Sequence, residues 1–252
     1  MKMHFLSGGR LRMRRSVFYP GSPKEETFEL PVSCALIRHA QGNVLFDTGC
    51  SPDAAINPEA RWGGVARAMP PIFQPEQTVI HELPKVGLSL DDIDLVVCSH
   101  LHPDHCGCNE HFKRATILCH AAELAAAREH GSKQGYIPQD WDQPQGFETF
   151  EAERDLFGDG RIVLIPLPGH TPGMTVARVT LEKDGAFLLA SDAAAVEANL
   201  VQGYAPRNSW DPAKAVAALA EIRKIGEGGA TIIFGHDDAQ WSTLRKGTSY
   251  YA

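Results

Sequence analysis

Three histidines and one aspartate lie within six consecutive residues of this chain, in the run Ser99-His100-Leu101-His102-Pro103-Asp104-His105. Imidazole nitrogens and carboxylate oxygens are the ligands that borderline divalent metals such as zinc prefer. Four such groups packed together resist burial unless a cation lies among them. The run therefore predicts a metal site, and the fold must bring further ligands to it.

The composition is that of an ordinary globular protein. The chain has 252 residues, of which 43% are hydrophobic and 22% charged, with a formal net charge of −7. An acidic chain without long runs of one charge disfavours a nucleic-acid partner. No apolar stretch is long enough to span a membrane, and the N-terminal residues lack the apolar core of an export signal, so we expect a cytoplasmic protein. Without a linker-like segment, residues 1–252 are expected to form one domain.

Short apolar runs alternate with helix-like segments, which is typical of an α/β fold. Four of the expected strands each end at a candidate ligand. They are residues 94–98 before His100, 162–165 before His170, 187–190 before Asp192, and 231–234 before His236. Because sites in open α/β sheets gather at the carboxyl ends of strands, these ligands can converge at one edge.

Other elements follow from the same patterns. Strands are expected over residues 35–39, 44–47 and 116–119, and helices over residues 76–86, 121–129 and 212–225. Residues 50–75 and 131–150 are expected to be loops that cover the site. Their large apolar side chains would suit an acyl chain or an aromatic ring of a substrate, although packing of the loops explains any one of them equally well. They are Trp62, Met69, Phe73, Trp141 and Phe147.

The spacing of the ligands indicates two metals rather than one. Residues two apart in an extended segment point the same way, so His100 and His102 can hold one ion. Asp104 and His105 follow Pro103, where a short helix is expected, and would face a second ion.

Two ions about 3.5–4 Å apart need a carboxylate that bridges them. Asp192 is the natural candidate, because it is an acid at a strand end. His170 would complete the first set of ligands and His236 the second.

The order of these motifs resembles the metallo-β-lactamase superfamily: His-x-His-x-Asp-His, then Pro168-Gly169-His170, Ser191-Asp192 and Gly235-His236. This resemblance implies an αββα sandwich with the metals at one edge. Asp47-Thr48-Gly49 also resembles the turn beneath the site in that family.

Within the superfamily, the chain most resembles the N-acyl-homoserine-lactone lactonases and 4-pyridoxolactonase. The motifs that carry this likeness are Leu30-Pro31-Val32-Ser33-Cys34, Ser99-His100-Leu101-His102 with Asp104-His105, Pro168-Gly169-His170-Thr171-Pro172-Gly173, and Phe234-Gly235-His236-Asp237.

The resemblance implies a hydrolase that opens an acyl-homoserine lactone or a similar cyclic ester with two divalent metal ions, expected to be zinc. Two metals can share a water molecule and lower its pKa to near neutrality, so that hydroxide attacks the carbonyl carbon. Asp104 is expected to orient this nucleophile and return a proton to the leaving oxygen. The partner is then a small-molecule substrate, and the protein is expected to be a monomer or a homodimer.

Two departures bear on the substrate. The lactonases carry a tyrosine three residues after the bridging aspartate, where its hydroxyl contacts the substrate carbonyl, and this chain has Ala195 there. Tyr204 or Tyr136 would have to supply that hydroxyl. The second departure is Cys106-Gly107-Cys108, where the family often has small residues, and a thiolate ligand there is a minor alternative.

Other reactions on the same site stay open, namely hydrolysis of other esters, thioesters or phosphotriesters and iron-dependent redox chemistry. A β-lactamase is disfavoured because no export signal is seen. A glyoxalase-II-like thioesterase is disfavoured because no extra C-terminal helical segment is seen, and a tRNA-processing nuclease because the chain is acidic.

Overall fold

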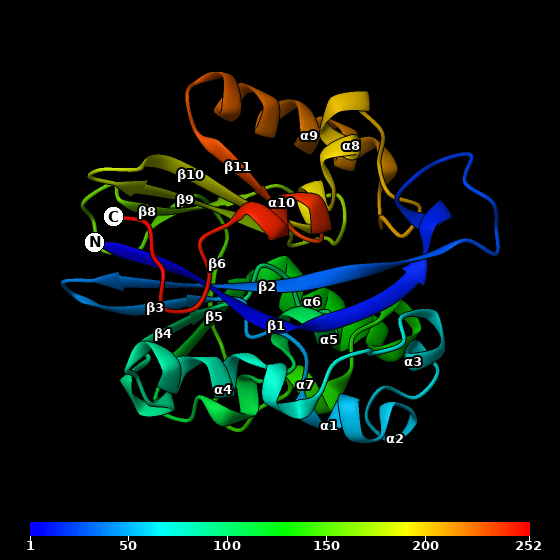
Figure 1. The fold of residues 1–252 in the computed structure, drawn as a ribbon, viewed down its shortest axis with the longest axis horizontal. Helices are drawn as coiled ribbons and strands as arrows, with labels where there is room; N and C mark the ends of the chain where they lie inside the picture. The colour runs from blue at the N-terminus through cyan, green and yellow to red at the C-terminus, as the bar shows by residue number, and fades with distance from the viewer.

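Two β-sheets lie face to face in the computed structural model, which describes residues 1–252 (Figure 1). The six-stranded sheet has the order β1-β2-β3-β4-β5-β6, and the five-stranded sheet has the order β11-β10-β9-β8-β7. The first contains β1 (Lys2–Arg14), β2 (Thr27–His39), β3 (Gly42–Phe46), β4 (Leu95–Val97), β5 (Thr116–His120) and β6 (Glu148–Phe150). The second contains β7 (Arg154–Asp155), β8 (Ile162–Pro166), β9 (Thr175–Leu181), β10 (Gly185–Ser191) and β11 (Thr231–Phe234).

The core between the sheets is built by alternate residues of the strands. On β2, Ala35 and Ile37 pack toward β8 to β11, whereas Cys34 and Leu36 pack on the opposite face. This is the two-residue period of a strand that is buried on both faces. Each sheet therefore has an outer apolar face that helices must cover.

Helices cover both outer faces, as Figure 1 shows. The six-stranded sheet is covered by α4 (Val79–Glu82), η3 (Leu83–Val86), α6 (Ala121–His130) and α7 (Pro138–Trp141). The other sheet packs against α9 (Pro212–Glu227), through residues such as Leu219 and Ile222. The αββα sandwich expected from the sequence is thus confirmed.

The remaining helices are short. They are η1 (Arg15–Val17), α1 (Pro52–Ile56), α2 (Pro58–Trp62), α3 (Val65–Ala68), η2 (Pro75–Gln77), η4 (Leu90–Asp92), α5 (Pro103–Cys106), η5 (Asn109–His111), η6 (Gly131–Gln134), η7 (Asp192–Ala194), α8 (Glu197–Gln202) and α10 (Asp238–Thr243). None of the helices combines the length and the apolar character that crossing a membrane would require.

Several predicted boundaries are wrong. The helix expected over residues 76–86 is three short pieces, because Thr78 is extended and its hydroxyl donates to the Pro75 carbonyl. The last long helix passes through Gly226 to Glu227, although Asp211 caps its start as expected. The segments 50–75 and 131–150 are not plain loops, since they contain α1 to α3 and η6, α7 and β6 respectively.

Parallel pairing places the ends of the ligand-bearing strands at one edge. Strand β4 runs parallel to β3 and β5, and β10 runs parallel to β11. Strands β4, β10 and β11 end at Val97, Ser191 and Phe234, so His100, Asp192 and His236 each follow a strand end within three residues. The sheets therefore supply the scaffold for the site.

Candidate metal centre

Seven side chains gather at this edge in three overlapping groups that could each hold a metal ion. The groups are His100 with His102 and His170, His100 with His105 and Asp192, and Asp104 with His105 and His236. All are buried except His102, which is half-buried. These are the residues that the sequence predicts as ligands.

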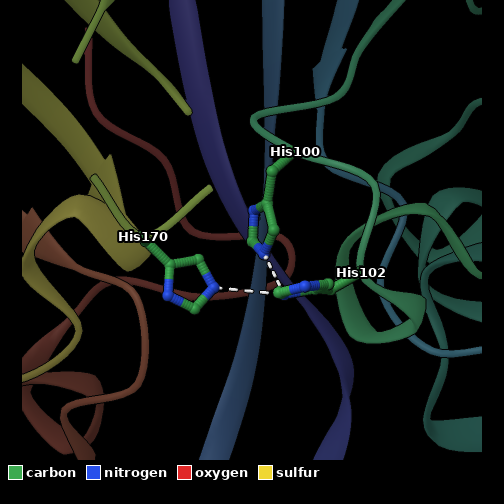
Figure 2. A group of neighbouring side chains, drawn as sticks. All are labelled: His100, His102 and His170. Atoms are coloured by element: carbon green, nitrogen blue, oxygen red, sulfur yellow. Dashed lines mark hydrogen bonds between the residues drawn. The ribbon is translucent and has the colours of Figure 1, made fainter. Parts of the chain in front are cut away.

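The first group consists of three imidazoles whose nitrogens meet. Nδ1 of His102 lies 3.0 Å from Nε2 of His100 and 3.1 Å from Nε2 of His170, and the three rings point toward one another (Figure 2). Nε2 of His102 donates to the Gln134 carbonyl at 3.0 Å. Because a carbonyl oxygen only accepts, Nδ1 of the neutral ring carries a lone pair toward the other two rings.

The second group lies on the short helix α5 and at the end of β11. Pro103 occupies the first turn of α5, and Asp104 and His105 follow it. His105 does not turn away from His100 as expected: their ring centroids lie 4.1 Å apart, and His105 belongs both to the group of His100 and Asp192 and to the group of Asp104 and His236. Oδ2 of Asp104 lies 3.5 Å from Nε2 of His105 and 3.6 Å from Nε2 of His236. His236 donates from Nδ1 to the Pro31 carbonyl at 2.9 Å, which leaves its Nε2 lone pair for the site.

Asp192 lies between the two groups. Its Oδ1 is 2.9 Å from Nε2 of His236 and 3.4 Å from Nε2 of His105, and its Oδ2 is 3.3 Å from Nε2 of His170. Each carboxylate oxygen therefore faces a different group of imidazoles. This arrangement suits a carboxylate that contacts two cations.

The unpaired atoms of the site fit metal ions. Nε2 of His105 and Oδ1 of Asp192 are buried without a hydrogen-bond partner. A buried polar atom left unpaired is destabilising by about 1–3 kcal/mol, so such atoms need another partner. Five imidazoles and two carboxylates are a donor set that zinc and similar divalent ions accept.

The pKa shifts separate the histidines into two kinds. Burial, together with the neighbouring histidines, lowers the pKa of His100 well below its usual value, and burial lowers that of His170 to about 3. Burial also opposes charge on His105, but Asp104, Asp192 and Asp47 raise its pKa well above the usual value. His100 and His170 are therefore neutral at pH 7, the form in which imidazole binds a metal.

Asp47 holds Ser99 and His105 of the metal-binding run in place by hydrogen bonds. Its carboxylate accepts hydrogen bonds from the Ser99 amide at 2.7 Å, from the Ser99 hydroxyl at 2.8 Å and from Nδ1 of His105 at 2.9 Å. Gly49, two residues later, has φ of +70°, and a Cβ there would lie 2.4 Å from the Gly8 Cα. The turn at residues 47–49 is thus fixed against both β1 and the metal-binding run.

Glu123, a fully buried residue of α6, supports the ligand loops and was not predicted from the sequence. Its carboxylate accepts from the Leu101 amide at 3.0 Å and from the Gly173 amide at 2.9 Å. It therefore joins the loop of His100 and His102 to the loop of His170. The only signal was an acidic residue in the first turn of an alanine-rich helix.

A cavity of about 980 Å³ opens above the first group of ligands, and His102 and His170 are part of its lining. Of the side chains predicted to contact substrate, Trp62 and Met69 line it. Phe73, Trp141 and Phe147 are not among its lining residues. Phe73 and Trp141 are buried in apolar clusters, and Phe147 packs against the cluster that contains Trp141.

The cavity also has an aromatic wall that the sequence did not single out. Trp210 lines it and is 43% exposed. Its amide donates to the His170 carbonyl at 2.9 Å. The only signal was a tryptophan immediately before the helix cap Asp211.

The structure shows the surroundings of Ala195 and of the two tyrosines considered as substitutes for the lactonase tyrosine. Ala195 is 1% exposed and packs in an apolar cluster with Phe18 and Ile137. Tyr136 lines the cavity but is only 1% exposed, and burial, together with the nearby Glu123 carboxylate, raises the pKa of its hydroxyl. Tyr204 is not among the lining residues, so it is not placed to supply the missing hydroxyl.

The cysteines do not join the ligands. Cys106 and Cys108 are buried, free and outside all three groups. The Cys108 thiol donates to the Cys50 carbonyl at 3.1 Å. Between them, a Cβ on Gly107 would lie 2.4 Å from the Ser51 amide nitrogen, which shows how closely this loop packs.

The fold and the arrangement of the site define a class of protein. The chain belongs to the metallo-beta-lactamase superfamily, whose family model matches residues 27–236. The resemblance seen in the motifs is confirmed.

Curated relatives cover almost the full length. N-acyl homoserine lactonase AttM of Azorhizobium caulinodans is 28% identical, over 100% of this chain and 98% of the relative. N-acyl homoserine lactonase AiiB of Agrobacterium fabrum is 32% identical, over 98% of this chain and 97% of the relative.

Solved structures agree with this. An N-acyl homoserine lactone hydrolase with the product N-hexanoyl-L-homoserine bound at its catalytic metal centre has a TM-score of 0.90 at 26% identity, over 99% of this chain and 98% of that chain. The dizinc quorum-quenching lactonase AidC has a TM-score of 0.71 at 16% identity, over 94% of this chain and 87% of that chain, which indicates a shared fold.

Proposed function

We propose that this protein is a metal-dependent hydrolase that opens lactones, with acyl-homoserine lactones or similar cyclic esters as the substrate class. The observation that carries the proposal is Asp192, whose two oxygens face separate groups of imidazoles beside a large cavity. Relatives named N-acyl homoserine lactonases match the chain over nearly its whole length. A solved relative holds a ring-opened product at its catalytic metal centre.

Two divalent ions, expected to be zinc, fit the donor set. In this proposal His100, His102 and His170 hold one ion, Asp104, His105 and His236 hold the other, and Asp192 contacts both. Such ions polarise an ester carbonyl and bring the pKa of a water molecule close to neutrality.

Asp104 is the group we propose for proton transfer. Although burial opposes its charge, His105 and His236 lower the pKa of Asp104, so the carboxylate is ionised at pH 7. It can accept a proton from the attacking water and return one to the alkoxide formed when the ring C–O bond breaks. Met69 and the exposed ring of Trp210 offer apolar surface for the rest of the substrate.

A panel of substrates tests this function on zinc-loaded protein: acyl-homoserine lactones, other lactones, aryl esters, thioesters and phosphotriesters. We expect lactone opening, measured as one equivalent of acid released per turnover. Activity on aryl esters or phosphotriesters with none on lactones would overturn the substrate class. Metal analysis of the purified protein separates a zinc hydrolase from an iron-dependent redox enzyme.

Two variants test the site assignment. Asp104→Asn and His102→Ala are expected to lose most of the activity, by about 100-fold or more, because each removes a group that contacts the reacting atoms or an ion. Circular dichroism should show that the fold is retained. Wild-type turnover in either variant at full metal loading contradicts the assignment.

Three expectations from the sequence stay predictions. These are one domain over residues 1–252, a cytoplasmic location, and a monomer or a homodimer. Light scattering coupled to size-exclusion chromatography measures the mass in solution, and cell fractionation locates the protein.

A further inference from the structure

We infer that Asp140 is a positioning residue that holds Arg61 and Trp62 in the cavity wall and thereby governs how tightly substrate binds. The inference rests on the proposed function only in taking this cavity as the place where substrate binds. It concerns a carboxylate that the metal centre does not use.

Asp140 is a fully buried carboxylate in α7 with both oxygens paired. Oδ1 accepts from Nε of Arg61 at 2.6 Å, and Oδ2 accepts from the Trp62 indole nitrogen at 3.1 Å. A buried carboxylate is strongly destabilising unless such partners are present. Asp140 therefore requires Arg61 and Trp62 at these positions, and both residues line the cavity.

The guanidinium of Arg61 extends the connection to other elements. It contacts Asp53 of α1 at 3.4 Å and Glu110 of η5 at 2.8 Å, and it donates to the Gln139 carbonyl at 3.2 Å. The Arg61 side chain is only 11% exposed and that of Asp140 is fully buried, so this ion pair is weakly screened by solvent. The side chains of Glu110 and Asp53 are 37% and 64% exposed, so solvent screens their contacts with Arg61 more strongly. We call Arg61, Asp140, Glu110 and Asp53 the Arg61 clamp.

The clamp joins the two segments that cover the cavity. Helices α2 and α7 have five and four residues, too short to be stable without tertiary contacts. Residues of both segments line the cavity, among them Trp62 of α2 and Pro138 of α7. Loss of the clamp contacts is therefore expected to increase the mobility of both segments that line the cavity, the one with α2 and the one with α7.

The clamp does not include any of the seven ligands. The cavity wall contacts the substrate to the same extent in the ground state and in the transition state, so loosening the clamp should weaken the binding of both equally. Such a loss raises KM and leaves kcat nearly unchanged. A role in the metal centre would instead lower kcat or the metal content.

The test compares Asp140→Asn and Arg61→Lys with Asp142→Asn in zinc-loaded protein. Asp142 is an exposed carboxylate two residues from Asp140 and serves as the matched control. The amide introduced by Asp140→Asn would place a donor against either Arg61 or Trp62, whereas Arg61→Lys would keep the charge but lose the forked contacts. We expect KM to rise about tenfold in both clamp variants, with kcat within about threefold of wild type.

Two further readouts do not depend on turnover. Hydrogen–deuterium exchange of residues 57–64 and 137–142 should become faster in the clamp variants and stay unchanged in Asp142→Asn. The zinc content should equal that of the wild type in all three. Arg61→Lys keeps the test informative if Asp140→Asn does not fold.

Wild-type KM together with unchanged exchange would overturn the inference, as would a fall in kcat and zinc content. Failure of the proposed function gives a different result, because the wild type then does not open lactones. The role of the clamp is still tested in that case, by KM for the substrate that the protein does turn over and by the exchange rates.

Discussion

Imidazole rings in the metal centre are oriented by hydrogen bonds on the side away from the site. His102 donates to the Gln134 carbonyl, His236 donates to the Pro31 carbonyl, and His105 pairs with Asp47. Such partners select the ring nitrogen that faces a metal ion and hold the ring plane. The acceptors come from three distant parts of the chain, so the orientation of each ring depends on the complete fold.

Glu123 has the same supporting role for the backbone of the ligand loops. Glu123→Gln would place an amide donor against the amide of Leu101 or Gly173, leaving one buried N–H unpaired. We expect zinc affinity to fall about 10- to 100-fold, because partners behind the ligands have effects of this size. A competition titration with a chromophoric chelator measures it.

The control for this variant lies on the same helix. Glu129→Gln alters an exposed glutamate of α6 and should leave zinc affinity unchanged. Equal affinity in Glu123→Gln and the wild type would show that the two loops are held without this carboxylate.

The cysteines provide a test of burial at the residue scale. All six are free and buried, and burial raises the pKa of each thiol. A raised pKa moves thiolate formation to higher pH, and the thiolate is the reactive form. At pH 8 we therefore expect no rapid reaction of the native protein with a chromogenic disulfide reagent.

In guanidinium chloride the thiols regain ordinary pKa values, about 8.5, and all six should react. Rapid labelling of the native protein at Cys106 or Cys108, located by mass spectrometry, is the result that would contradict the packing of that loop.

At the scale of elements, the loop that carries His170 is held between two helices by close backbone contact. A Cβ on Gly169 would lie 2.5 Å from the Ala215 Cα of α9, and a Cβ on Gly173 would lie 2.4 Å from the Glu123 amide nitrogen of α6. Only a residue without a side chain allows these approaches. The two glycines thereby fix the distance of His170 from both helices.

Gly173→Ala is expected to destabilise the protein by about 1–3 kcal/mol, because the added methyl group forces α6 and the loop apart. Chemical denaturation measures the change. Gly64→Ala is the control, since its new Cβ would find its nearest neighbour at 3.8 Å and its φ is not positive. If Gly173→Ala unfolds at the same denaturant midpoint as the wild type, the loop and α6 can move apart to admit the methyl group without lowering the free energy of unfolding.

The elements that the sequence predicts well are those determined by local pattern. The strand leading to His100 is an apolar run that is buried on both faces, and Pro103 marks the start of α5. The segments over the cavity are different, because their short helices depend on distant partners such as Asp140. An isolated Glu123 or Asp140 in a sequence is as compatible with an exposed residue as with a buried one.

At the scale of the whole molecule, the ligands are divided between the two sheets. His100 and the residues of α5 follow β4 of the six-stranded sheet, whereas His170, Asp192 and His236 follow strands of the other sheet. Every group of ligands that could hold an ion contains residues from both sheets. Bound ions would therefore cross-link the sheets.

Removal of the ions should accordingly lower the stability of the whole protein. A ligand that binds only the folded state at 1,000 times its Kd stabilises it by about 4 kcal/mol. For a chain of this size, that corresponds to a fall in Tm of roughly 8–16 °C per ion removed by a chelator. Calorimetry with and without chelator measures the shift, and added zinc should restore the original Tm. An unchanged Tm in protein shown to be metal-free would contradict this. It would mean that the apolar core alone holds the sheets together at this edge, and that the imidazoles and carboxylates satisfy one another's charges and hydrogen bonds without an ion.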